Sequence, residues 1–112
     1  MNINLETVND IIVIRLEGNV MGGPEAVRLN EEINQLLDEE KKKVVLDLGK
    51  VNRMNSSGLG ILINALTTFK QNGGQLKLAN IASRVSTLLS VTKLNSVFES
   101  YDTVDEALKS YY

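Results

Sequence analysis

The chain has 112 residues, which fits one domain, and 43% of them are hydrophobic and 23% charged, as in an ordinary globular fold. The formal net charge of −2 is too close to neutral to attract nucleic acid or anionic lipid by its overall field. Cysteine and histidine are both absent, which excludes disulfides, thiolate nucleophiles, Cys-zinc sites and the Ser-His-Asp triad. We therefore expect a protein that is not an enzyme and has no catalytic residues, metal site, cofactor or direct contact with nucleic acid.

No targeting or membrane segment is apparent. The first residues lack the basic region and apolar run of a signal peptide. The longest strongly apolar stretch, Leu59 to Leu66, contains Gly60 and Asn64 and is far shorter than the about 20 residues that span a bilayer. We expect a cytoplasmic protein without membrane insertion.

The N-terminal third predicts a hairpin followed by a helix. Residues 2–8 alternate apolar and polar side chains, and residues 11–16 form a β-branched apolar run. Asn9 and Asp10 between them are a two-residue turn signal, so we expect an antiparallel hairpin. Residues 18–23 predict a flexible loop. Pro24 suits the first turn of a helix, which carries apolar residues at helical spacing and ends near Glu40.

The middle of the chain predicts a buried strand and a buried helix. Residues 44–48 are almost continuously apolar, as in a central strand covered on both faces. Residues 49–55 are predicted to be a connection, after which Ser56 or Ser57 offers an N-cap for an apolar helix through Phe69.

The remaining elements complete an α/β pattern after the break at residues 72–74. We expect a strand at 75–79, a helix from about Ala82, a short edge strand at 97–100, and a last helix capped by Asp102 or Thr103. The alternation predicts one domain over residues 1–112: a single-layer mixed β-sheet of about four to five strands with about four helices, opening with the hairpin.

The most informative segment is residues 54–60, Met-Asn-Ser-Ser-Gly-Leu-Gly, which joins the buried strand to the apolar helix. Its two hydroxyls lie where a helix exposes unpaired N–H groups and the positive end of its dipole. An anion is stabilised at such a position, and phosphorylation of a serine there adds about −1.5 to −2 charges. That charge would repel a partner that presses a carboxylate or an apolar surface against the helix start.

The same residues also allow a purely structural interpretation. Ser56 and Ser57 can serve only as helix caps, worth about 1 kcal/mol, and Gly58 and Gly60 can serve only to bring the helix close to the sheet. Because glycine in a helix costs about 1 kcal/mol relative to alanine, two glycines here require a reason. Packing is one reason, and access for a partner or a kinase is another.

Residues 44–48 followed by residues 54–60 resemble the STAS domain of bacterial anti-sigma factor antagonists. The resemblance extends over nearly the whole chain. It includes the opening hairpin, the Gly73-Gly74 break, the strand at 75–79, and the step Val91-Thr92-Lys93-Leu94 before Val97-Phe98.

The resemblance implies a partner switch. In that family the antagonist binds a serine-kinase anti-sigma factor and frees the sigma factor. The kinase inactivates the antagonist by phosphorylating the first hydroxyl of the motif, and a PP2C-type phosphatase restores it. The acceptor position falls on Ser56 here, and the strand acid of the family corresponds to Asp47. We expect a monomer or a weak dimer.

The resemblance also implies a partner surface, in which the loop from Asn19 to Pro24 lies beside the helix start. Met21 is either an adaptable apolar contact there or a loop residue folded back onto the core. The implied surface consists of Asn19, Met21, Gly22, Asn55, Ser56, Ser57, Gly58 and Leu59.

One departure from the family pattern keeps other functions open. The family usually has aspartate before the acceptor serine, whereas this chain has Asn55, which keeps the size and capping ability but removes a charge. This loss either changes kinase recognition or marks a member that is not phosphorylated. The alternative function is a STAS-type regulatory or scaffold module in another pathway, of the stressosome, chemotaxis or transport-accessory kind. Nucleotide binding is a weaker alternative, because the chain lacks the third glycine of a dinucleotide fingerprint and a Walker lysine.

Overall fold

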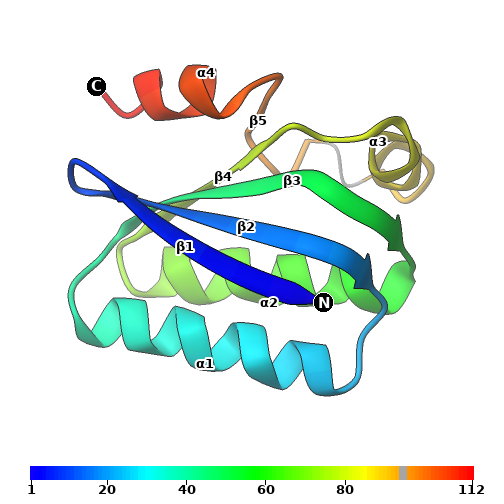
Figure 1. Ribbon diagram of the computed structural model, residues 1–112, viewed down its shortest axis with the longest axis horizontal. Coiled ribbons are helices and arrows are strands. Elements are labelled where there is room, and N and C mark those ends of the chain that lie inside the picture. The colour runs from blue at the N-terminus through cyan, green and yellow to red at the C-terminus, as the bar shows by residue number, and fades with distance from the viewer. Residues whose placement is uncertain (94–95) are drawn as a thin grey trace.

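The computed structural model describes residues 1–93 and 96–112, and its centre is a five-stranded sheet in the order β1-β2-β3-β4-β5 (Figure 1). The strands are β1 (Asn2–Val8), β2 (Ile11–Val20), β3 (Lys43–Met54), β4 (Gln75–Ala79) and β5 (Ser100–Tyr101). The helices are α1 (Pro24–Asp38), α2 (Ser56–Gln71), α3 (Ser83–Val91) and α4 (Val104–Lys109). The mixed α/β architecture predicted from the sequence is confirmed. Leu94, which the family resemblance includes, lies outside the described residues.

The sheet begins with the predicted hairpin and continues in parallel. β1 pairs with β2 antiparallel, with Asn2 opposite Glu17 and Val8 opposite Ile11. Asn9 in the turn has a φ of 56°, in the left-handed region that asparagine tolerates better than most residues. β3 pairs in parallel with both β2 and β4, so its predicted central position is confirmed.

Two strands run further than the sequence pattern predicts. β2 continues through Gly18 to Val20, and β3 continues through Gly49 to Met54, although both segments were expected to be loops. These extensions pair with each other after register shifts near Gly18, so that Val20 lies opposite Met54. Neither segment has a strand pattern of its own, and it is the pairing between them that makes both extended.

The last elements also differ in detail. The short edge strand is Ser100–Tyr101 rather than residues 97–100, because Phe98 turns into the core, where it is 4% exposed. Thr103 caps α4 as predicted: its hydroxyl accepts a hydrogen bond from the Glu106 N–H at 3.1 Å.

The two faces of the sheet are covered unequally (Figure 1). α1 and α2 lie together on one face and enclose the larger core. α4 lies over one end of the other face and encloses a smaller cluster of Ile11, Val13, Val45, Ala79 and Ala107. Within the described residues, no helix combines the length and the apolar character needed to cross a membrane.

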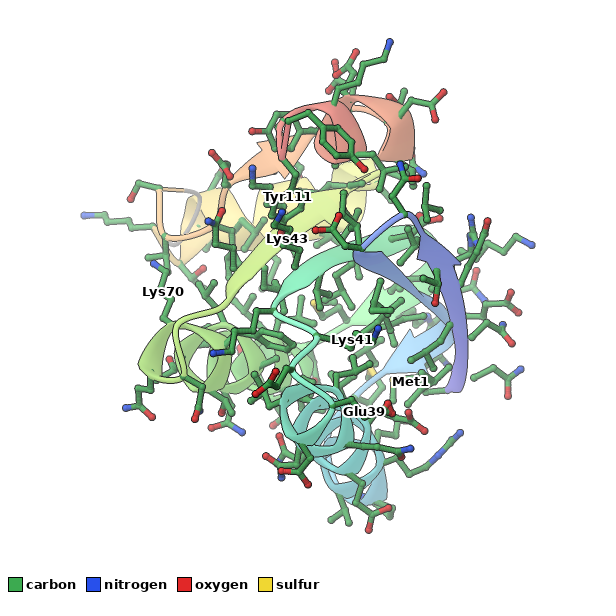
Figure 2. All side chains as sticks on the ribbon, turned by 90° about the vertical axis from the view of Figure 1, so that its left-hand side faces the viewer. Met1, Glu39, Lys41, Lys43, Lys70 and Tyr111 are labelled. Carbon is green, nitrogen blue, oxygen red and sulfur yellow. The ribbon has the colours of Figure 1, made fainter. Side chains whose placement is uncertain are left out.

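Tyr111 fastens the C-terminal segment to the first residues of β3 and β4 (Figure 2). Its hydroxyl donates to the Val44 carbonyl at 2.6 Å and lies 3.0 Å from the Gln75 carbonyl, while the Val44 N–H donates to it at 3.2 Å. Burial raises the pKa of the Tyr111 phenol above its ordinary value, so the hydroxyl keeps the proton that it donates. The ring also packs on Lys77, whose ammonium lies 4.0 Å from the ring centroid.

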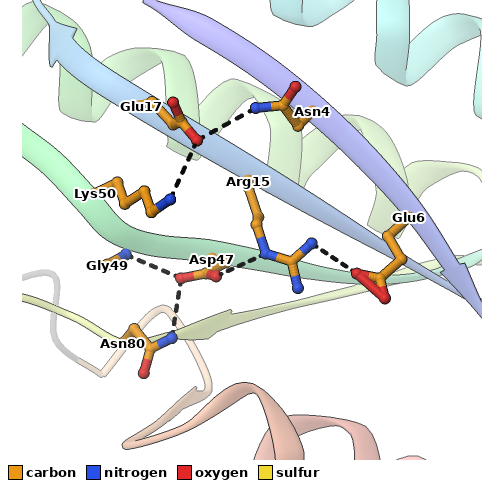
Figure 3. A network of polar contacts seen from close by, with 8 residues as sticks. All are labelled: Asn4, Glu6, Arg15, Glu17, Asp47, Gly49, Lys50 and Asn80. Carbon is orange, nitrogen blue, oxygen red and sulfur yellow. Dashed lines mark hydrogen bonds and ion pairs between the residues drawn. The ribbon is translucent and has the colours of Figure 1, made fainter.

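Next to the α4 cluster, the same face of the sheet carries a polar network (Figure 3). Asp47 accepts hydrogen bonds from the Gly49 N–H at 2.9 Å and the Asn80 amide at 3.0 Å, and it pairs with Arg15 at 3.3 Å. Arg15 also bonds to Glu6 at 2.7 Å, and this hydrogen bond raises the pKa of the guanidinium. Asp47 therefore ties β2 and β3 to Asn80, directly after β4.

Candidate functional site

The start of α2 is capped by Asn55. The Asn55 backbone is extended, with φ −106° and ψ −175°, and its side-chain oxygen accepts a hydrogen bond from the Gly58 N–H at 2.8 Å. Its backbone carbonyl accepts a hydrogen bond from the Leu59 N–H at 2.9 Å. The prediction that Ser56 or Ser57 would cap the helix is wrong, because asparagine is among the best N-cap residues and occupies that position here. Neither serine therefore serves as the N-cap of α2.

Ser56 and Ser57 occupy the first two positions of α2 with exposed side chains. Neither hydroxyl has a hydrogen-bond partner among residues 1–93 and 96–112. The first turn contains no acidic residue, so no carboxylate within it offsets the positive end of the helix dipole. The site thus combines an accessible hydroxyl with an electrostatic environment that favours an added negative charge.

The loop that follows β2 lies against this helix start. A Cβ atom on Gly22 would lie 2.9 Å from the Ser57 Cβ, so the loop backbone and the helix are in direct contact there. Gly22 also has a φ of 100°, which favours glycine. Met21 projects outward and is 42% exposed, and its N–H donates to the Glu25 carboxylate at 3.0 Å. Met21 is therefore not folded back onto the core, and its role as a contact residue stays a prediction.

The two glycines of the motif differ in their surroundings. A Cβ atom on Gly58 would lie 1.8 Å from the Val20 carbonyl oxygen and 2.7 Å from its carbon, so only glycine lets α2 pack on the end of β2. A Cβ atom on Gly60 would have no heavy atom within 4 Å. Close packing therefore explains Gly58, whereas Gly60 is exposed and packing gives no reason for it.

All the residues predicted for the partner surface lie at this end of the molecule or directly beneath it, and we call the exposed part the switch surface. Gly58 and Leu59 are buried, Leu59 at 2% exposure, so they hold the helix start in place and do not form the surface. The switch surface consists of Asn19, Met21, Gly22, Asn55, Ser56 and Ser57, of which Gly22 is half-buried and the others are exposed.

Arg53 is an exposed residue of this region that the sequence did not single out. It lies opposite Asn19 in the β2–β3 ladder and two residues before Asn55. The sequence predicts a loop at this point, and a loop does not define where the Arg53 side chain lies. The continuation of β3 to Met54 places Arg53 beside Asn19. It adds a cation to the neighbourhood of the helix start.

Within the described part of the chain, no group of three or more His, Cys, Asp or Glu side chains lies close enough to share an ion.

We expect Asn55→Ala to lower the free energy of unfolding by about 1 kcal/mol, because the Gly58 N–H loses its acceptor. Asn55→Asp is the matched control, since aspartate caps equally well and restores the charge that the family usually has. Urea denaturation of the three proteins measures both effects. An alanine variant as stable as the parent would show that the hydrogen bond contributes nothing.

Comparison with known proteins identifies the family. Residues 2–107 match the STAS domain model. The chain is 33% identical over 103 residues to the anti-sigma-B factor antagonist of Bacillus subtilis (strain 168), covering 88% of this chain and 91% of that protein. An anti-sigma factor antagonist from Mycobacterium paratuberculosis has the same fold, with a TM-score of 0.83 at 22% identity over 97% of this chain and 92% of that chain.

A second solved structure has the same fold. The Bacillus cell fate determinant SpoIIAA in its phosphorylated form matches with a TM-score of 0.76 at 18% identity, over 99% of this chain and 100% of that chain. The sheet order, the motif at the start of α2 and these relatives agree. The chain belongs to the STAS domain family of anti-sigma factor antagonists.

Proposed function

We propose that this protein binds a serine-kinase anti-sigma factor through the switch surface and thereby releases a sigma factor in the cytoplasm. Phosphorylation of Ser56 by the kinase ends the binding, and a PP2C-type phosphatase restores it. The protein acts by binding and does not itself catalyse a reaction. The observation that carries the proposal is the exposed Ser56 hydroxyl at the first position of a helix whose first turn has no acidic residue.

The electrostatics at Ser56 support a modification that leaves the fold intact. A phosphate there faces the unpaired N–H groups of the first turn, which stabilise its charge of about −1.5 to −2. The added group lies on an exposed surface and displaces no core side chain. Its effect is therefore exerted on the partner, which meets a new dianion at the centre of the switch surface.

Phosphate transfer tests the acceptor directly. The purified protein is incubated with the anti-sigma kinase of the same organism and ATP, and the modified residue is located by mass spectrometry. We expect one phosphate on Ser56, its loss in Ser56→Ala, and unchanged labelling of Ser57→Ala, which removes the neighbouring exposed hydroxyl. Absence of phosphate from the parent, or equal labelling of Ser56→Ala, would refute the proposed acceptor.

Asn55 favours a second candidate: a STAS-type scaffold or regulatory module that binds its partner without being phosphorylated. Asn55 provides the cap but no negative charge before the acceptor, unlike the usual family pattern. The two candidates differ in the behaviour of Asn55→Asp toward the kinase. If the parent is not labelled and Asn55→Asp is, the kinase requires the missing charge, and the second candidate is favoured.

A further inference from the structure

Strand β1 leaves one long edge of the sheet open. Among the residues that the structure describes, it is the first strand in the sheet order and pairs only with β2, and in Figure 2 it forms the right-hand border with no ribbon beyond it. The strand has seven residues, five of them exposed. At the opposite border, β5 has only two residues. β1 is therefore the longer of the two edges at which another strand could add.

The hairpin fixes which backbone groups of β1 face outward. Val8 and Ile11 flank a two-residue turn, and in such a hairpin the flanking residues form a hydrogen-bonded pair. Because hydrogen-bonded and non-hydrogen-bonded pairs alternate along an antiparallel ladder, the even-numbered residues of β1 bond to β2. Ile3, Leu5 and Thr7 consequently turn their N–H and C=O groups toward the open edge.

β1 also lacks the features that usually prevent edge pairing. Its sequence contains no proline and no lysine, its register against β2 is unbroken from Asn2 to Val8, and Glu6 is its only charged residue. Leu5, at the midpoint of the strand, is 42% exposed even though its partner across the ladder, Ile14, is fully buried. The edge is thus long, regular and apolar at its centre.

The pattern of outward groups is symmetric about Leu5, and we propose that β1 pairs with β1 of a second copy of this chain. In the antiparallel register centred on Leu5, the Leu5 residues of the two copies lie opposite each other and Ile3 of each lies opposite Thr7 of the other. Every outward N–H of these residues then meets an outward C=O. Glu6 lies opposite Asn4, so the register places no two like charges together.

The resulting dimer has a single continuous sheet and buries Leu5 against its own copy. A dyad between the paired strands keeps both α1 helices on one face of that sheet. The switch surface follows the C-terminal ends of β2 and β3, and none of its residues belongs to β1 (Figure 1). The inference is independent of the proposed function, because it requires neither Ser56 nor a kinase.

Sedimentation equilibrium from micromolar to millimolar concentration tests the dimer. We expect the average mass of the parent to rise from 12.4 kDa toward twice that value.

Leu5→Lys places two ammonium groups opposite each other at the dyad, so the dissociation constant should rise by about tenfold or more. Thr7→Pro, which removes an outward N–H and none of the hydrogen bonds to β2, should weaken the dimer as well. Val27→Lys is the matched control, since Val27 is 58% exposed on α1 and its substitution should have no effect.

Amide hydrogen exchange supplies a second measurement that reports on the pairing itself. Raising the concentration should slow exchange at Ile3, Leu5 and Thr7, while Asn4 and Glu6 keep the protection that β2 gives them. A parent that stays monomeric at millimolar concentration overturns the proposal. So does a dimer that Val27→Lys weakens as much as Leu5→Lys, or one in which the β1 amides show no concentration dependence.

Discussion

Gly58→Ala is expected to lower the free energy of unfolding by about 3 kcal/mol, the largest stability effect that we predict for a single methyl group in this chain. The added Cβ would lie 1.8 Å from the Val20 carbonyl oxygen, which belongs to the backbone and cannot rotate away. Relief requires α2 to move off the end of β2, and this movement also disturbs the Asn55 cap on the Gly58 N–H.

Gly60→Ala is the matched control for that experiment. It adds the same methyl group two residues further along the same helix, where no heavy atom lies within 4 Å of the new Cβ. Alanine is the better helix former, so stability should rise by up to about 1 kcal/mol. Urea unfolding gives both values. Equal losses in the two variants would mean that helix α2 does not pack on Val20 as described.

Ser56→Asp is expected to weaken capture of the anti-sigma partner by about tenfold to a hundredfold, equivalent to about 1.4–2.8 kcal/mol of binding free energy. The carboxylate imitates part of the phosphate charge at an exposed position, so the fold should persist while the partner meets a negative group. Titration calorimetry of the parent and the variant against the purified partner measures the difference.

Two further variants separate charge from position. Ser56→Asn has nearly the size of aspartate without its charge, and it should bind within a few-fold of the parent. Ser57→Asp carries the same charge one residue further on, where the side chain lies against Gly22. If Ser56→Asn and Ser56→Asp lose affinity equally, bulk and not charge controls the interaction. If Ser56→Asp binds like the parent, the electrostatic mechanism is wrong.

The sequence was sufficient for the elements whose own residues determine them. The almost continuous apolar run at 44–48 predicted the central position of β3, and the apolar circumference of α2 predicted its burial. The sequence was not sufficient where a segment becomes a strand only by pairing with another segment. Residues 18–20 and 49–54 have loop-like composition and become strands only by pairing with each other, which no local pattern can indicate.

The candidate site was predictable to a similar degree. The position of Ser56 followed from the motif between strand and helix, and its exposure is confirmed. Serine hydroxyls are good caps, and so the pattern indicates Ser56 or Ser57, yet Asn55 lies one residue earlier and forms the cap. The sequence could not show that Gly58 is required for packing, because the residue it packs against, Val20, is remote in sequence and adjacent in space.

The close packing of α2 on the Val20 carbonyl has a consequence for the proposed signalling. Because α2 rests directly on the Val20 carbonyl, the proposed phosphorylation of Ser56 does not depend on a shift of the helix, and we expect its effect to be exerted in the bound complex. In the proposed switch, the phosphorylated fraction of a single site changes gradually with the ratio of kinase to phosphatase activity. On this proposal, a threshold in the pathway comes from stoichiometric capture of the partner or from the enzymes that act on this protein, and not from a conformational switch within it.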